Sequence, residues 1–395
     1  MKNESAIRSP QSKIAVVGAG PAGSSIAIRL AQDGFETVLV ERDEFPRQKL
    51  CGEFISPECF AHFESLGVLE DMMEAGGDRI SETRFFESGG KSITVPSTWF
   101  GRGDFALSLS RAEMDHRLLR RAREVGVTVL ENTTITGVER IDDRIVSIKA
   151  RTEDGITSNI AADIFIDATG RSRVIARLAE KAVTVSSSRP KPGLVGFKAH
   201  LKGADLDNGL CEIYSFPGGY AGLSNIELGL ANLCFLIKAS TVRSIGNDAA
   251  EIVQRVVFRN KRASHTLREA TADSDWLAVS IDSFGTRPTV AAENLYTVGD
   301  AAAFIDPFTG SGMVMAFESA QVLAETVSAN HTSPELIAAE YLAAYRKKFA
   351  NRLRLCSLLR RSAFMPNVAT TLVSLLSIST NARRALARAT RGPAI

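Results

Sequence analysis

Three glycines and one acid near the start of the chain carry the clearest chemical signal in the sequence. Gly18, Gly20 and Gly23 form a Gly-x-Gly-x-x-Gly pattern, and Glu41 ends the next apolar run. Gly18 permits a tight turn, Gly20 lets backbone approach a pyrophosphate, and Gly23 lets a helix pack closely on a strand. Glu41 lies where a carboxylate accepts hydrogen bonds from ribose hydroxyl groups. A glycine-rich turn alone would not require this acid, so the pattern predicts a dinucleotide site.

The elements that must position these residues alternate between strands and helices. Apolar runs at 14–17 and 37–40 flank a helical pattern at 22–33, which is the β-α-β order of a parallel sheet. The N-terminus of that helix offers free N–H groups to phosphates. Residues 183–285 instead alternate strand-like runs with turn glycines, which predicts an antiparallel sheet. Further helices are expected at 56–75, 111–126, 248–260, 311–328, 334–362 and 380–390.

Composition limits the classes of protein that fit. A chain of 395 residues with 45% hydrophobic and 23% charged residues suits a globular protein of about two domains. No run of 18 apolar residues predicts a membrane span, and the polar first thirteen residues predict a flexible tail, not a signal peptide. Five cysteines without a CxxC pair favour a reducing cytoplasm. The five histidines lack metal-ligand spacing, so we expect no metal, and no pattern indicates a nucleic-acid partner.

The C-terminal region 341–395 is strongly basic. It holds eleven Lys and Arg residues and no Asp or Glu, whereas the whole chain has a net charge of +2. Such a region attracts an anionic partner: a membrane surface, an acidic carrier protein that presents a tethered substrate, or a phosphorylated substrate. The alternative is a solvated helix pair that lies against the acidic body of the same protein.

Two later segments extend the nucleotide pattern and carry a resemblance. An apolar run at 163–167 ends in Asp-Ala-Thr-Gly170, and a run at 295–298 precedes Gly299-Asp300 and a Pro-Phe-Thr-Gly-Ser-Gly loop at 307–312. In this order the segments resemble the flavoprotein hydroxylases and geranylgeranyl reductases that share the para-hydroxybenzoate-hydroxylase type of FAD fold. The resemblance implies an α/β, Rossmann-like FAD-binding domain of the GR2 type, with an inserted antiparallel β-sheet substrate domain and a helical C-terminal tail.

The resemblance also implies a discontinuous domain organisation. We expect the FAD-binding domain in three parts, the substrate domain in two parts, and a separate basic helical region. In chain order the expected boundaries are 1–82 (FAD), 83–110 (substrate-domain strands), 111–182 (FAD), 183–288 (antiparallel substrate sheet), 289–330 (FAD) and 331–395 (basic helical region).

Cofactor contacts carried over from the family follow these motifs. The Ala-Thr-Gly turn would lie near the FAD pyrophosphate, Asp300 would bind a ribityl hydroxyl, and the loop after Pro307 would lie against the flavin ring. Arg111 matches the arginine of an Arg-xxx-Asp-xx-Leu helix that meets the cofactor, with a helix-cap salt bridge as the alternative, and backbone near Ile135 would contact adenine. The residues expected to bind FAD are Gly18, Gly20, Ala22, Gly23, Glu41, Arg42, Cys51, Gly52, Arg111, Ile135, Asp167, Gly170, Asp300, Gly310, Gly312 and Met313.

The segment Pro46-Arg-Gln-Lys-Leu-Cys-Gly-Glu53 resembles a segment that lies beside the flavin in geranylgeranyl-reductase-like proteins. Lys49, Cys51 and Glu53 are therefore the catalytic candidates: the amine would stabilise negative charge, the carboxylate would act as acid or base, and the thiol would be redox-active. The alternative is that Arg47 and Lys49 only hold FAD phosphates while Cys51 packs without reacting.

Residues 212–233 resemble the substrate-side Tyr-x-Trp-x-Phe-Pro motif of prenyl reductases, with Tyr214 in place of the tryptophan. The tryptophan-rich motif that marks flavin halogenases is missing. We expect an apolar pocket lined by aromatic side chains, with simple core packing as the alternative. The expected lining residues are Phe197, Tyr214, Phe216, Tyr220 and Pro307.

The resemblance implies three redox reactions on a small apolar substrate. We favour an NAD(P)H-dependent monooxygenase that hydroxylates an aromatic or polyketide-type substrate through a flavin C4a-hydroperoxide formed from molecular oxygen. A single glycine fingerprint suits transient docking of NAD(P)H. The alternatives are reduction of isoprenoid double bonds, halogenation in which a lysine captures hypohalite, and a non-catalytic flavin-binding docking protein.

Overall fold

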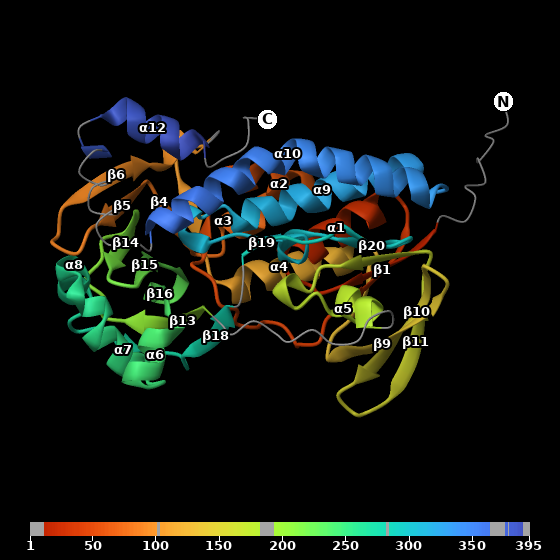
Figure 1. Cartoon of the computed structure of the whole chain (residues 1–395), viewed down its shortest axis with the longest axis horizontal. Coiled ribbons are helices and arrows are strands. Elements are labelled where there is room, and N and C mark those ends of the chain that lie inside the picture. The colour runs from red at the N-terminus through yellow and green to blue at the C-terminus, as the bar shows by residue number, and fades with distance from the viewer. Residues whose placement is uncertain are drawn as a thin grey trace.

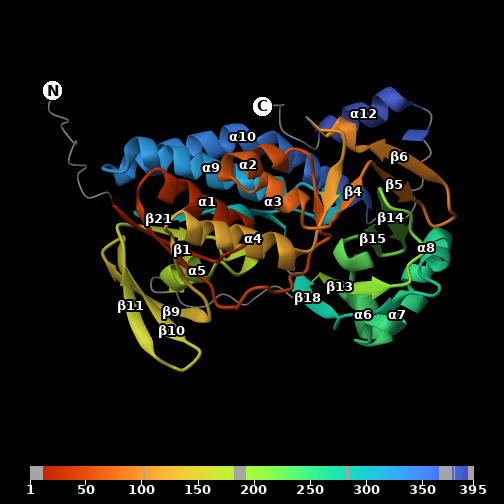
Figure 2. The same ribbon diagram turned by 180° about the vertical axis from the view of Figure 1, so that it is seen from behind.

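The computed structural model describes residues 12–100, 103–181, 193–281, 284–363, 376, 377 and 379–389. The expected N-terminal tail before residue 12 and the basic residue Arg391 lie outside these ranges. Within them, two large sheets are joined by long C-terminal helices (Figures 1 and 2). Figure 1 shows one sheet with α6–α8 at one end of the molecule, and β9–β11 at the other end.

A six-stranded sheet forms from the predicted β-α-β pattern. Its order is β20-β21-β12-β1-β2-β8, and all neighbours are parallel except β20 and β21. Its strands are β20 (Val290–Ala292), β21 (Leu295–Thr297), β12 (Ile164–Asp167), β1 (Lys13–Val17), β2 (Glu36–Val40) and β8 (Thr128–Leu130). Val17 pairs in register with Asp167 on one side and Val40 on the other. The carboxyl ends of these strands therefore meet at one edge, where ligands bind in open parallel sheets.

Helices cover this sheet on both faces. The helix α1 (Pro21–Gln32) packs against α4 (Arg111–Glu124) and α9 (Gly312–Asn330), and α9 packs against the long α10 (Pro334–Ala363). On the other face, α5 (Val174–Lys181) shares a buried cluster with the three-stranded sheet of β9 (Thr133–Ile141), β10 (Arg144–Thr152) and β11 (Thr157–Ala161). The expected helix at 56–75 is two short helices, α2 (Cys59–Leu66) and α3 (Leu69–Met73), because Gly67 ends the first with a φ of 73°.

The second large sheet has eight strands and includes the predicted antiparallel segment. It contains β17 (Thr271–Ala272), β13 (Leu194–Lys202), β16 (Ala231–Lys238), β15 (Gly219–Asn225), β14 (Leu210–Phe216), β5 (Glu82–Phe86) and β6 (Ser92–Pro96) in order, with β18 (Leu277–Ile281) also on β13. One face is buried under α6 (Ala239–Ile245), α7 (Ala249–Arg255) and α8 (Lys261–Thr266). The expected helix at 248–260 ends at Arg255, and α8 follows as a separate helix.

Small elements complete the described chain. β3 (Phe54–Ile55), β7 (Ala106–Ser108) and β4 (Asp78–Ile80) form a separate sheet, and β19 (Gly285–Thr286) pairs with β22 (Ala303–Phe304). The C-terminal α12 (Thr380–Ala389) contacts β6, as Figure 1 also shows. The architecture confirms the predicted α/β fold with an antiparallel sheet and C-terminal helices.

Candidate cofactor and active site

The glycine turn after β1 has the steric demands that its pattern predicts. Gly18 has a φ of 99°, and a Cβ atom there would lie 2.5 Å from the carbonyl oxygen of Ala168. A Cβ atom at Gly23 would lie 1.8 Å from the carbonyl oxygen of Gly18. Both positions therefore require glycine, since any side chain would push α1 away from the β1 and β12 ends.

Gly20 is different, because a Cβ atom there would have no backbone atom within 4 Å. A Cβ atom there would have the guanidinium of Arg111, 3.6 Å away, as its nearest neighbour. Arg111 donates to both carboxylate oxygens of Asp115, at 2.9 and 2.7 Å. Burial disfavours the charge of Arg111, but Asp115 raises its pKa above the ordinary value. Arg111 thus forms the helix salt bridge that was the alternative and also stands beside the turn, as a phosphate-binding cation would.

Glu41 lies at the end of β2 with only 6% of its side chain exposed. Its carboxylate accepts hydrogen bonds from the backbone N–H of Ala19 at 2.7 Å and of Arg42 at 3.1 Å. Arg47 lies 3.5 Å from the same carboxylate and 2.9 Å from Asp115. The acid expected to bind ribose is therefore at the glycine turn. Arg42 is mostly exposed and pairs with Asp43.

Two further strand ends bring Asp300 to the same edge of the sheet. A Cβ atom at Gly170 would lie 4.0 Å from the Cβ of Asp300. Burial raises the pKa of Asp300 to about 6, although Arg171 and Arg111 act in the opposite direction. Within the described ranges, no hydrogen bond reaches its carboxylate, so this partly buried acid is free to accept one from a ribityl hydroxyl.

Asp167 stabilises the Ala-Thr-Gly turn through its own hydrogen bonds. Its carboxylate is fully buried and accepts from the N–H and hydroxyl of Thr169 and from the N–H of Ala176, at 2.6 to 3.0 Å. Since these donors occupy it, Asp167 shapes the Ala-Thr-Gly turn and does not face the cofactor site.

The remaining expected cofactor residues fall into two groups. A Cβ atom added at Gly52 or Gly312 would have no neighbour within 4 Å, so these two positions leave room for a ligand's approach. Gly310 has a φ of 61°, a conformation that favours glycine. Ala22 instead packs against the turn at Gly299, where a Cβ atom would lie 2.9 Å away. Ile135 is buried in the cluster beneath the six-stranded sheet, and Met313 packs against the main core.

These features together fit FAD. The buried acid at the end of β2 suits the adenosine ribose, the open glycine positions suit the pyrophosphate, and the acceptor at Asp300 suits the ribityl chain. The residues that would hold FAD are the 18–23 turn, Glu41, Arg111, Asp300 and the 310–313 loop.

A buried polar cluster joins this site to the eight-stranded sheet. Glu53 is fully buried in the left-handed region, with a φ of 54°. One carboxylate oxygen accepts from the ammonium of Lys198 at 2.5 Å and the N–H of Arg111 at 2.8 Å, and the other lies 2.8 Å from Nε2 of His200. Lys198, 2% exposed, also donates to the side-chain oxygen of Gln48 at 2.8 Å. The carboxylate thus balances a buried cation next to the loop that resembles the flavin-side segment.

Two cysteines lie in the same region. Cys51 accepts from the N–H of Glu53 through its sulfur at 3.3 Å, and its carbonyl accepts from the amide of Asn232 at 3.1 Å. Cys234 is the register partner of Lys198 on the neighbouring strand, and burial raises the pKa of its thiol. The raised pKa makes the Cys234 thiol a poor nucleophile, since the thiolate is the reactive form.

Lys49, a catalytic candidate from the sequence, lies apart from this cluster. Its ammonium donates to Asp43 at 2.8 Å, and burial lowers its pKa. Of the three candidates, the structure brings Cys51 and Glu53 into the buried cluster and places Lys49 in a partly exposed ion pair.

Most of the expected pocket residues lie in the core of the sheet. Phe197, Tyr214 and Phe216 point toward α6–α8, on the face opposite Lys198 and His200. This corrects the expectation that they line a substrate pocket, and the reason is the period-two alternation of strands, which sends neighbouring side chains to opposite faces.

Tyr220 lies on the face of the sheet opposite α6–α8, which we call the inner face and which also carries Lys198 and His200. Its hydroxyl donates to Asp306 at 2.6 Å, and Phe308 packs edge-on against its ring. Pro307 lies between these two residues and is exposed. Tyr220 and Pro307 therefore lie where the sheet meets the 307–313 loop, next to the expected flavin position.

The sequence missed Lys198 and His200. In Leu194–Lys202 the apolar residues alternate with Gly196, Lys198 and His200, which is the pattern of a strand with one solvated face. The loop before Glu53 covers that face instead, because Gly196 leaves space for it: a Cβ atom there would lie 2.5 Å from the side chain of Leu50. The signal in the sequence that could have identified Lys198 and His200 is their position on the same strand face as Gly196.

Neither a metal centre nor a membrane span occurs in the part of the chain that the structure describes. No three His, Cys, Asp or Glu side chains there converge as metal ligands. None of the helices in the described ranges is long and apolar enough to cross a bilayer.

The chain is similar to known proteins over most of its length. The tryptophan 2-halogenase of Chondromyces crocatus is 30% identical over 332 residues, which cover 80% of this chain and 60% of the halogenase. This chain thus spans three fifths of that relative's length. Digeranylgeranylglycerophospholipid reductase 2 of Methanopyrus kandleri is 27% identical over 82% of this chain and 80% of the reductase. The flavin-dependent brominase Bmp2 shares the fold, with a TM-score of 0.79 and 18% identity over 96% of this chain and 93% of its own.

A family model described as "FAD binding domain" matches residues 11–350. This range contains the glycine turn, Glu41, Asp300 and the 310–313 loop. The match covers most of the chain and confirms the resemblance drawn from the motifs. The chain therefore belongs to the FAD binding domain family.

Proposed function

We propose that the chain is an FAD-dependent oxidoreductase that halogenates an electron-rich small molecule. The observation that carries this proposal is the buried Lys198, whose amine lies on the inner face of the sheet beside the loop at 48–53. FAD, when bound and reduced, supplies the two electrons that activate oxygen for oxidation of halide. NAD(P)H is the proposed reductant.

The protein's own contribution is to hold an amine and exclude water. Glu53 and Gln48 fix the Lys198 ammonium, and His200 occupies the second oxygen of Glu53. In this proposal Lys198 would bind and orient a hypohalite. One carboxylate and one ammonium balance each other, so the burial of both is tolerated. In the balanced reaction, substrate C–H, halide, oxygen, reduced flavin and one proton give C–halogen, oxidised flavin and two waters.

The relatives support this choice over the hydroxylation that we favoured from the sequence. Besides the halogenase of Chondromyces crocatus, the relatives include a flavin-dependent halogenase of Armillaria mellea that is 25% identical over 80% of this chain. The missing tryptophan-rich motif weighed against halogenation, but Lys198 supplies the lysine that the reaction needs.

Hydroxylation is the second candidate, and one observation favours it. The two tryptophans of the chain lie away from the inner face: Trp99 packs beside α12, and Trp276 packs edge-on against Phe235 in the core under α6–α8. A site without tryptophan on that face differs from the halogenase motif. The same buried network would then position protons while oxygen is transferred to the substrate.

The test is product analysis with the FAD-loaded full chain. The protein is incubated with NADH, a flavin reductase, oxygen and a panel of phenols, indoles and pyrroles, with and without bromide. Products that carry the bromine isotope pair only when bromide is present support halogenation. Hydroxylated products that form equally without bromide overturn it in favour of hydroxylation. Saturation of a geranylgeranyl substrate without oxygen overturns both in favour of a reductase.

A further inference from the structure

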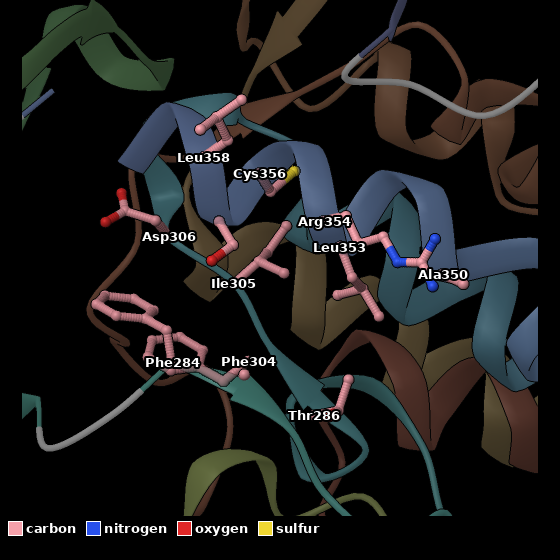
Figure 3. A pocket seen from close by; sticks show the side chains of 12 residues that line it. Phe284, Thr286, Phe304, Ile305, Asp306, Ala350, Leu353, Arg354, Cys356 and Leu358 are labelled. Atoms are coloured by element: carbon pink, nitrogen blue, oxygen red, sulfur yellow. The ribbon is translucent and has the colours of Figure 1, made fainter. Parts of the chain in front are cut away.

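A pocket of about 540 Å³ lies between α10 and the paired strands β19 and β22 (Figure 3). This volume is within the range of small-molecule sites, about 300–1,000 Å³. Phe284 and Phe304 lie on the strand side, and Leu353 and Arg354 lie on the α10 side, as Figure 3 shows. The pocket is separate from the Lys198 cluster but shares a loop with the cofactor site.

The strand side offers an aromatic surface. The rings of Phe284 and Phe304 stack with their centroids 4.8 Å apart and an angle of 15° between them. The guanidinium of Arg171 lies 5.2 Å from the Phe304 ring centroid. Flat, apolar walls of this kind favour an aromatic ligand, because a ring stacks on a ring with little loss of conformational entropy.

Arg354 adds one positive charge at the edge of the pocket. It is exposed, and within the described ranges no carboxylate lies within ion-pair distance of it. Its neighbours on the same helix differ, since Arg352 and Lys348 both pair with the buried Glu318. An unpaired guanidinium beside apolar walls selects a ligand with an anionic group, and a carboxylate matches its fork geometry.

The pocket is connected to the expected flavin position through one short segment. Ile305 and Asp306 line it and directly precede the 307–313 loop. Asp306 accepts from the hydroxyl of Tyr220 on the inner face of the sheet and from the N–H of Phe308. A ligand in the pocket would therefore touch Ile305 and Asp306. These residues lead into the cofactor loop, and Asp306 is hydrogen-bonded to the sheet through Tyr220.

We infer that this pocket is a second small-molecule site, and that its ligand is an aromatic molecule with a carboxylate group. This inference goes beyond the proposed function, because the pocket shares no lining residue with the Lys198 cluster. The aromatic surface would hold the ring beside Ile305 and Asp306, and Arg354 would hold the carboxylate.

The test compares binding of 1-hydroxy-2-naphthoate and its methyl ester to the oxidised, FAD-loaded full chain. Titration of ligand fluorescence needs no turnover, so it is independent of the proposed reaction. We expect the acid to bind roughly fivefold more tightly than the ester, as an exposed ion pair allows. R354Q should remove that preference. R346Q, which removes an exposed cation two turns earlier on α10, is the matched control and should keep it.

Filling the pocket gives a second, independent measurement. Ser357 lines the pocket and is exposed, so S357F should weaken binding of acid and ester alike without loss of FAD absorbance. Equal binding of acid and ester by the natural protein, or equal effects of R354Q and R346Q, would overturn the inference. Binding that behaves as expected with no halogenated product would overturn the proposed function and leave the ligand class standing.

Discussion

At the scale of single residues, Glu53 organises the candidate active site. Its φ is positive, a backbone conformation that residues other than glycine rarely adopt, and its side chain is fully buried. Backbone strain of this kind costs on the order of 1–3 kcal/mol and persists where the surroundings hold it. Here the carboxylate receives Lys198, His200 and the N–H of Arg111, so the strained residue links β13 of the eight-stranded sheet to the start of α4.

We expect K198M to lower halogenation at least about a hundredfold, as loss of a positioned amine commonly does. FAD binding, followed by absorbance, should change less than about threefold, because Lys198 touches none of the expected FAD residues except through Glu53. K49M is the matched control and should retain activity, since Lys49 pairs with Asp43 at the surface.

A double variant separates chemistry from folding. Removing one partner of a buried pair costs about 3–5 kcal/mol because the other charge stays buried. E53Q with K198M leaves no charge uncompensated, so its melting temperature should recover relative to K198M while halogenation stays absent. Recovery of activity in the double variant would show that Lys198 is only structural.

The raised pKa of Asp300 predicts that FAD binding depends on pH. Its pKa is raised to about 6 by burial, and a ribityl hydroxyl donates best to the ionised form. FAD affinity should therefore rise as pH increases through 6, by roughly tenfold between pH 5 and 7.5. Fluorescence-quenching titrations of the natural protein and D300N check this. A D300N curve that keeps the same pH slope would assign the titration to another group.

At the scale of elements, the parallel strands explain why distant segments form one site. β1, β12, β2 and β21 run in the same direction, so the turns after them lie together although they are far apart in sequence. The glycine turn must let α1 start directly against β1 and β12. The steric cost of a side chain there depends on which glycine is replaced.

Gly20 and Gly23 form a matched pair for this argument. G23A puts a Cβ atom 1.8 Å from a backbone oxygen and should cost about 3 kcal/mol of unfolding free energy. G20A meets only the Arg111 side chain at 3.6 Å and should melt within a few degrees of the natural protein. Because its methyl group enters the pyrophosphate space, G20A should still weaken FAD binding about tenfold or more. Strong FAD binding by G20A would contradict the predicted pyrophosphate position.

At the scale of the whole molecule, α10 and α12 bring the basic C-terminal region alongside the eight-stranded sheet. α12 contacts β6, with Ala387 in a cluster with Trp99 and Phe100. The guanidinium of Arg384 lies 5.3 Å from the Trp99 ring centroid, and Arg388 is exposed. From these exposed cations we propose that the helix docks an acidic carrier protein that presents a tethered substrate, one of the partners that the sequence leaves open.

Salt should separate tethered from free substrate. Raising the salt concentration from about 50 to 300 mM screens surface charges, so it should slow turnover of a carrier-tethered substrate several-fold and leave a free one unchanged. R388E should reproduce the effect at low salt. Equal salt responses for the two substrates would rule out docking through this helix.

The spacing of residues in the sequence was enough to predict the cofactor half of the site. Gly18, Gly23 and Glu41 follow from local rules, since a strand, a tight turn and a helix constrain the residues between them. The same holds for the turn that carries Asp300. The family match over 11–350 confirms the resemblance that these motifs carry.

The inner face of the second sheet was decided only by tertiary structure. Alternation in Leu194–Lys202 shows that Phe197 and Lys198 point to opposite faces, but not which face packs against α6–α8. Burial of Lys198 and His200 depends on a loop far away in the sequence that brings a carboxylate to them. Hydrophobic periodicity tells only which face of its own strand a side chain points to. A buried charge also needs a partner of opposite charge, and that partner comes from a distant segment of the chain.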